Sequence, residues 1–181
     1  MQRWIRRSLC IALAAAALVS AGWAPSLQPT SAHAAIDLVG DPAPGIIETP
    51  AEQALLDLLN ADRAQNGLPP LDFDPDTLSI ARRRASTQLQ LPNLSHYDDT
   101  GQLAFVRFLT DAELQYQLAG ENLARAEGAN DPTIAQRIEQ ALMGSPNHRH
   151  NILERNFTLV AIGAATDSLD RIAFAEIFRE Q

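Results

Sequence analysis

The chain has 181 residues, a length that suggests one domain plus a terminal segment. Hydrophobic residues make up 46% of it, which is enough to bury a sizeable core. Its 14 basic residues are all arginine, and 22 acids give a formal net charge of −8 at pH 7. Nucleic acids and anionic membrane surfaces carry negative charge and would repel such a chain, so we expect neither as a partner.

The first 34 residues have the pattern of a secretory signal peptide. Three arginines lie among the first seven residues, an apolar stretch follows at 8–21, and Ala-His-Ala precedes the expected cleavage site before Ala35. The apolar run is shorter than the ~20 residues that span a bilayer. We therefore expect a secreted protein with no stable membrane span. Cleavage would also remove Cys10, the single cysteine of the chain, so we expect no disulfide in the mature protein.

Residues 35–48 contain two prolines and two glycines and are interpreted as a linker, which places the folded domain at 49–181. The domain begins with Thr-Pro-Ala-Glu at 49–52, a capping box with proline at the first helical position. Leucines at helical spacing then predict a helix over 50–66, and Gly67 is a typical residue after its C-terminus.

A second helix is predicted to start after Asp74 and to end near Leu91, because Pro92 disfavours its continuation. Its three consecutive arginines, at 82–84, point around much of the helix, and we interpret them as a solvent-exposed face. Shorter helices are predicted near 102–109, after Asp-Pro at 131–132, and over 145–153.

The C-terminal segment has the two-residue period of β-strands. Residues 157–165 are apolar, 166–170 favour a turn, and 171–178 alternate, which predicts a hairpin. Glu176 shares a face with hydrophobic residues in the second strand, so it needs a partner such as Arg149 or a histidine, unless the strand lies at an exposed edge. Several helices with this small, mostly antiparallel sheet indicate an α+β fold, a three-layer α/β/α sandwich.

Five blocks in the chain carry a resemblance to a known family. They are Leu-Leu-Asp-Leu-Leu-Asn-Ala-Asp-Arg at 55–63 with Gly-Leu-Pro-Pro-Leu at 67–71, the helix over 74–85, Ser-His at 95–96 followed by Gly101, Gly-Glu-Asn-Leu-Ala at 120–124, and Ser-Pro-Asn-His-Arg-His-Asn-Ile-Leu at 145–153. Together they resemble bacterial domains of the CAP superfamily, which includes cysteine-rich secretory proteins, venom allergens and plant pathogenesis-related proteins. The resemblance covers about residues 50–179.

The resemblance implies a shared cleft that contains His96, Glu121 and His148. The chain departs from the family where Leu-Met-Gly, at 142–144, replaces the tryptophan that usually precedes Ser-Pro. It also lacks a clear equivalent of the second glutamate in the eukaryotic His-Glu-His-Glu tetrad, and Glu176 stands where the last strand usually carries glutamine. A complete tetrad is therefore not predicted.

The two histidines have the chemistry of metal ligands. His96 lies in a polar loop, and His148 lies near a helix N-terminus, whose partial positive charge favours the neutral imidazole that binds metals. Glu121 is suited to pair with a histidine and fix its tautomer. Purely structural roles are the alternatives: a loop hydrogen bond for His96, and helix or backbone capping for His148 and Glu121. His150 is expected at the surface.

Two functions are compatible with these residues. We expect a non-catalytic secreted CAP-domain protein whose cleft, formed by His96, Glu121, His148 and Glu176, binds zinc or another divalent cation through its histidines, or a small ligand such as a lipid or cell-surface component. The alternative is a metal-dependent extracellular hydrolase acting on peptide or cell-wall material. No catalytic residue is assigned, because no activated nucleophile is evident and family members share a fold more than an activity.

Overall fold

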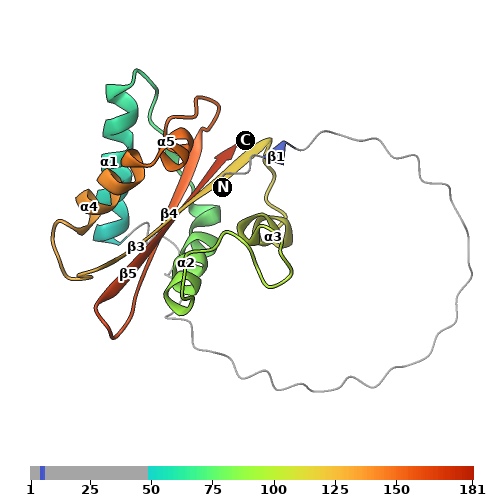
Figure 1. Cartoon of the computed structure of the whole chain (residues 1–181). Helices are drawn as coiled ribbons and strands as arrows, with labels where there is room; N and C mark the ends of the chain where they lie inside the picture. The colour runs from blue at the N-terminus through green and yellow to red at the C-terminus, as the bar shows by residue number, and fades with distance from the viewer. Residues whose placement is uncertain (1–4, 7–48) are drawn as a thin grey trace, which may run out of the picture.

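The computed structural model describes residues 5–6 and 49–181. The predicted linker at 35–48, the expected cleavage site and all but two residues of the predicted signal peptide lie outside the described residues. In the described part, one sheet separates two layers of helices (Figure 1). The predicted α+β fold with three layers is confirmed.

Five helices lie close to their predicted positions. They are α1 (Pro50–Gln65), α2 (Pro75–Gln90), α3 (Ala104–Asp111), α4 (Ile134–Gly144) and α5 (Pro146–Ile152). The predicted capping box is present at the start of α1: the backbone N–H of Glu52 donates to Thr49 Oγ1, and the backbone N–H of Thr49 donates to Glu52 Oε2 over 2.7 Å. None of the helices in the described residues is long and apolar enough to cross a bilayer.

The sheet has the strand order β1-β3-β5-β4-β2. Its strands are β1 (Ile5–Arg6), β2 (Asp72–Phe73), β3 (Leu118–Glu127), β4 (Leu159–Thr166) and β5 (Arg171–Glu180). Only the β2–β4 pair is parallel, so the sheet is mostly antiparallel, and β4 with β5 forms the predicted hairpin. Strand β3, which contains the Gly-Glu-Asn block, was not predicted.

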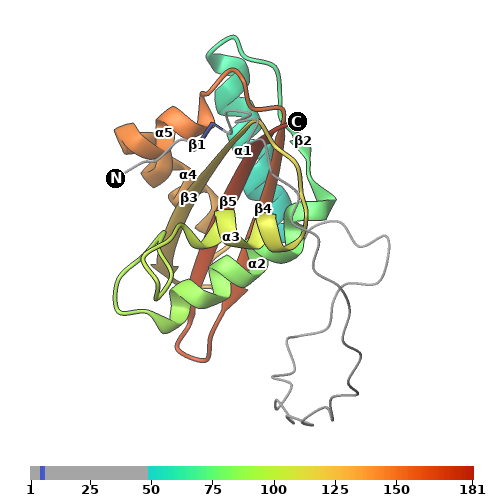
Figure 2. The ribbon, with the colours of Figure 1, turned by 90° about the vertical axis from the view of Figure 1, so that its right-hand side faces the viewer.

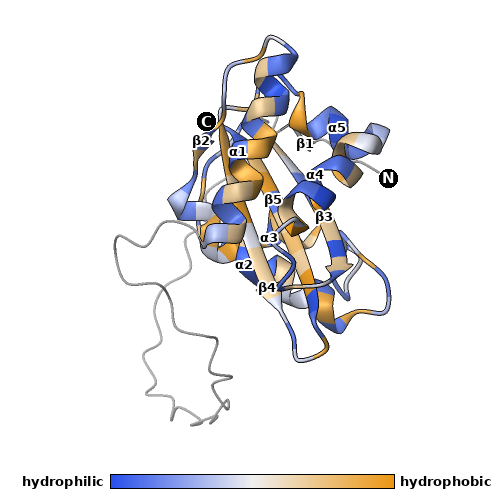
Figure 3. Ribbon diagram, turned by 90° about the vertical axis from the view of Figure 1, so that its left-hand side faces the viewer, coloured by the Kyte–Doolittle hydropathy of each residue, from blue (hydrophilic) through white to orange (hydrophobic). Residues whose placement is uncertain are grey.

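Side chains alternate between the two helical layers. Even-numbered residues of β3, β4 and β5 face α1, α4 and α5, where Val160, Ile162 and Phe174 join the larger core cluster. Figure 3 shows α1, α4 and α5 on this face of the sheet. Odd-numbered residues face α2 and α3, where Ala161 and Ile177 pack with Ile80 and Phe105 of these helices. Figure 2 shows α2 and α3 on this face of the sheet. Each functional residue of the sheet therefore belongs to one layer or the other according to its position in its strand.

Helix α2 lies directly on the sheet because β4 has a glycine beneath it. A Cβ atom at Gly163 would lie 2.1 Å from the backbone nitrogen of Arg82 and 2.2 Å from the carbonyl carbon of Ala81. These distances are too short for any side chain, so only glycine permits this approach. The close contact brings the side chains of α2 down to the sheet. One of them, Arg84, reaches Glu121 of β3 in the candidate site.

Candidate functional site

Glu121 is a buried carboxylate on the α2 face of β3, and both of its oxygens are occupied. Arg84 of α2 donates from Nε to Oε1 over 2.6 Å and from a terminal nitrogen to Oε2 over 3.2 Å. Oε2 also lies 2.7 Å from Nδ1 of His96. Neither Arg84 nor Glu121 exposes more than a few per cent of its side chain, so their ion pair is shielded from water.

Arg84 also fixes the loop that carries His96. The guanidinium nitrogen that reaches Glu121 Oε2 donates to the carbonyl oxygen of Ser95 over 2.6 Å. Gln88, one turn further along α2, donates to the same oxygen and accepts from the Ser95 backbone N–H. The carbonyl of His96 accepts from the backbone N–H of Ala104 at the start of α3. The histidine is thus held at both sides by backbone contacts, while its ring remains one-quarter exposed.

His148 approaches from the opposite helical layer. It lies on α5 and is half-buried. Burial lowers the pKa of its imidazole, and the charge of nearby His96 lowers it further. Both causes favour the neutral ring at neutral pH, as the sequence predicted on other grounds. His150 is exposed, as expected.

A network of buried amides fixes α5 against β3. Asn122 donates from Nδ2 to the backbone carbonyl of His148 over 3.2 Å and to Glu176 Oε2 over 2.8 Å. Asn151 of α5 donates to Asn122 Oδ1 over 2.7 Å and to the backbone carbonyl of Glu121 over 3.3 Å. Asn122 therefore holds the backbone of His148, and Asn151 holds Asn122 in turn.

Glu176 lies on the other side of the sheet from Glu121. Its side chain is completely buried on the α1, α4 and α5 face, where its partner is Asn122, its neighbour across the two strands. Burial raises the pKa of Glu176 to about 7, although the Asn122 hydrogen bond acts in the opposite direction. Arg149, considered from sequence as its partner, donates to the carbonyl of Met143 instead. The structure thus brings His96 and Glu121 together with His148 nearby, and places Glu176 in a separate environment.

Arg84 is the site residue that sequence reasoning missed. The prediction of a solvent-exposed face for the three arginines is wrong for this residue, which is 1% exposed. A signal was present, because Arg84 lies three residues after Ala81 and four before Gln88, both buried on the same stripe of α2. Its burial requires the long-range partner Glu121, which helical spacing alone does not reveal.

The described part of the chain contains no group of three or more His, Cys, Asp or Glu side chains arranged to hold a metal ion. His96 and His148 are therefore the candidate nitrogen ligands, with Glu121 already committed to Arg84 and His96. Two imidazoles suit a site that water or another ligand completes. They do not suit a structural zinc site, which takes four protein ligands.

Comparison with known proteins identifies the family. The sequence model described as "CAP: Cysteine-rich secretory protein family" matches residues 56–176, which is well over half of the chain. The chain therefore belongs to the CAP family. The resemblance drawn from the sequence blocks is confirmed, although this chain contains only one cysteine.

Three relatives illustrate the relationship. The chain is 32% identical over 112 residues to the uncharacterized protein YkwD of Bacillus subtilis (strain 168), covering 62% of this chain and 41% of YkwD. It is 26% identical to an extracellular protein containing an SCP domain from Bacillus anthracis str. Ames, with a TM-score of 0.58 over 72% of this chain and 40% of that one. The chain thus spans about two fifths of both. A structure described as NaASP2 with Zn²⁺ shares the fold at 10% identity, with a TM-score of 0.54 over 75% of this chain and 82% of that one.

Proposed function

We propose that this CAP domain is an extracellular binding module that holds a divalent cation between His96 and His148 without catalysing a reaction. The hydrogen bond between His96 Nδ1 and Glu121 Oε2 is the observation that carries the proposal. It commits Nδ1 and leaves Nε2 of the same ring available to a ligand. A metal-binding histidine is usually supported by a carboxylate that accepts a hydrogen bond from the ring nitrogen not bound to the metal.

His148 supplies the second nitrogen in this proposal. Its lowered pKa favours the neutral imidazole, the form that coordinates a metal. The zinc bound to NaASP2 supports a choice of zinc as the first cation to test, while water or a ligand group would occupy the remaining positions. Extracellular action is proposed from the signal-like N-terminus and from the description of the Bacillus anthracis relative.

The hydrolase alternative is less well supported by the same contacts. A metal-dependent hydrolase needs a carboxylate or imidazole positioned to take a proton from water. Glu121 has no free oxygen for that role, because Arg84 occupies both and His96 shares one. The Ser95 hydroxyl is not arranged as an activated nucleophile either, because it donates to the backbone carbonyl of Tyr97 and not to a general base.

The test is a zinc titration of the purified chain by calorimetry. We expect about one equivalent to bind, and we expect binding to be lost in the His96→Ala/His148→Ala double variant. The matched control is His150→Ala, which removes an exposed histidine two residues away on the same helix and should leave the titration unchanged. Equal binding by the double variant, or no binding by the wild-type chain, would refute the cation site.

A further inference from the structure

Glu176 is a completely buried acid that is linked to His148 through one side chain, that of Asn122. Its Oε2 accepts a hydrogen bond from Asn122 Nδ2 over 2.8 Å, while its Oε1 has no hydrogen-bond partner among the described residues. Asn122 Nδ2 also donates to the backbone carbonyl of His148 over 3.2 Å. A buried carboxyl group with one unsatisfied oxygen costs free energy, so stability alone does not account for an acid at this position.

The Asn122 amide is fully paired in the orientation that the structure shows. Its two N–H groups go to Glu176 and His148, and its Oδ1 accepts from Asn151 Nδ2 over 2.7 Å. If the amide turned over, Oδ1 would face the Glu176 carboxylate and the His148 carbonyl, and both of these groups only accept hydrogen bonds. The carboxylate is the closer of the two acceptors, and its charge strengthens the hydrogen bond, so it favours the observed orientation most.

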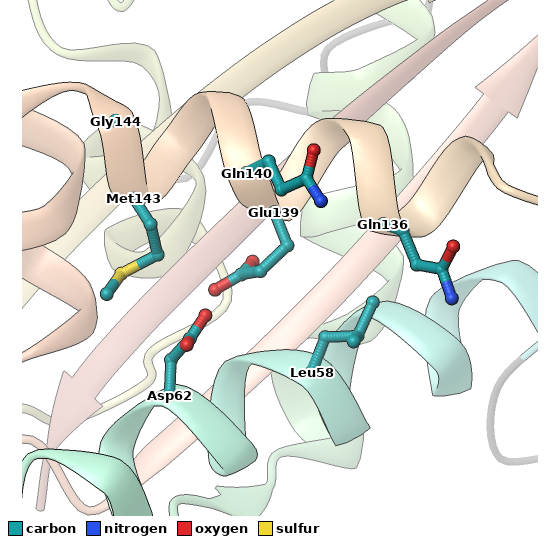
Figure 4. Close-up of a pocket in the computed structure, with 7 residues that line it drawn as sticks. All are labelled: Leu58, Asp62, Gln136, Glu139, Gln140, Met143 and Gly144. Carbon is teal, nitrogen blue, oxygen red and sulfur yellow. The ribbon is translucent and has the colours of Figure 1, made fainter.

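The groups around Glu176 leave this contact to Asn122. Burial raises the pKa of Glu176 to about 7, so the carboxylate predominates at pH 8. Glu139 of α4 keeps its proton there, because burial and neighbouring negative charges raise its pKa to about 10, and its carboxyl group is directed toward Asp62 of α1 (Figure 4). Burial lowers the pKa of His148 on α5, so this ring is neutral at pH 8.

We propose that Glu176 is a positioning residue for His148: as the closest acceptor of the Asn122 amide, it directs an N–H group to the His148 carbonyl and so sets where α5 lies against β3. Glu176 acts through Asn122 and binds no ligand itself. The consequence for a cation rests on the proposed function, whereas the hydrogen bonds can be measured on the metal-free protein.

The test compares two variants that differ in one acceptor oxygen. Glu176→Gln keeps an oxygen that can accept from Asn122, and Glu176→Met keeps a similar side-chain volume without an acceptor. Ile172→Met is the matched control, because Ile172 is a buried residue on the same face of β5 and has no hydrogen bond in this network. Thermal unfolding should show Glu176→Met melting no lower than Ile172→Met, since an apolar group of similar size is cheaper to bury than a half-satisfied carboxyl group.

The positioning role is measured by NMR on the metal-free full chain at pH 8. In the wild type we expect a scalar coupling across the hydrogen bond from Asn122 Nδ2 to Glu176, and slow hydrogen exchange of the Asn122 side-chain amide. Glu176→Met should accelerate this exchange and shift the ring signals of His148. Glu176→Gln should preserve both features, and Ile172→Met should match the wild type.

Zinc titration then connects the network to the proposed site. Glu176→Met should weaken zinc binding about 10-fold or more, the usual effect of disturbing the support of a metal ligand, while Glu176→Gln should bind nearly as the wild type does. A wild-type chain that binds no zinc would refute the cation site, and the NMR signals would still decide the positioning role.

Several results would overturn the proposal. They are the absence of coupling between Asn122 and Glu176 in the wild type, unchanged Asn122 and His148 signals in Glu176→Met, and equal disturbance by the glutamine and methionine variants. Failure of Glu176→Met to fold would assign Glu176 to the stability of the core instead. Full zinc affinity in a Glu176→Met chain whose amide has moved would show that the cation does not depend on this contact.

Discussion

The buried ion pair between Arg84 and Glu121 makes the sharpest prediction about this fold. Replacing Arg84 with methionine keeps a long, unbranched side chain in α2 but removes three hydrogen bonds, two to Glu121 and one to the Ser95 carbonyl. The Glu121 side chain is completely shielded from solvent, so its charge would keep only His96 as a partner. Breaking one side of a buried pair typically costs about 3–5 kcal/mol.

The cost should appear as a lower melting temperature. For a domain of this size each kcal/mol corresponds to about 3–5 °C, so Arg84→Met should lower Tm by roughly 10–20 °C. Thermal and urea unfolding followed by circular dichroism at pH 7 measures both quantities. The double variant Arg84→Met/Glu121→Gln should recover part of the loss, because a neutral amide is less costly to bury than a carboxylate.

The neighbouring arginine provides the control. Arg83 is exposed, with its guanidinium 4.1 Å from the centre of the Phe108 ring, an arrangement worth about 0.5–1 kcal/mol at an exposed site. Arg83→Met should therefore cost less than about 1 kcal/mol. If Arg84→Met unfolds at the same temperature as Arg83→Met, the ion pair is not what holds the His96 loop to α2, and the reasoning for the site fails.

Three further predictions concern residues of the sheet and of the two helical layers that cover it. The pKa of Glu139 in the folded protein, about 10, exceeds its ordinary value of 4.5. Its contribution to stability is therefore present below pH 4.5 and is lost as the pH rises toward 10. Urea unfolding at pH 5, 7 and 9 should show the free energy of unfolding declining on the order of 1 kcal/mol per pH unit, and Glu139→Gln should reduce this decline. Gly163→Ala should prevent or severely impair folding because its Cβ would strike the α2 backbone, whereas Gly144→Ala, with open space around it, should melt at the wild-type temperature. Asn151→Ala leaves the buried Asn122 amide without its donor and should cost about 1–3 kcal/mol in chemical unfolding, and an unchanged midpoint would contradict a structural role for the amide network.

The helices and the C-terminal hairpin were predictable because their signals are local. Thr49 and Pro50 mark the start of α1, and Pro75 and Pro92 bracket α2, since proline is favoured in a first turn and disfavoured further on. The hairpin follows from alternation around a polar turn at 166–170. In each case residues within one or two turns of each other contain the information, so a single sequence is sufficient.

Strand β3 could not be found in the same way. Glycine and asparagine are depleted in strands, and glutamate is depleted to a lesser degree, yet all three occur together at 120–122. The segment is buried on both faces and is paired with β5 along its full length, so its conformation depends on residues more than fifty positions away. Likewise, Arg84 is buried because Glu121 is there to receive it, and Glu176 receives a hydrogen bond from Asn122 on Oε2 alone.

The placement of Glu121 and Asn122 as neighbours in one strand explains how two helical layers can share one site. Successive side chains of β3 point to opposite faces, so Glu121 meets Arg84 and His96 on the α2 side, and Asn122 meets His148 and Glu176 on the α5 side. Any shift or tilt of β3 would move Glu121, which contacts the His96 ring, and Asn122, which contacts the His148 backbone, together. In the proposed cation site, the relative position of the two rings would therefore depend on a single strand, and the Gly-Glu-Asn block would position the two histidines instead of binding the cation.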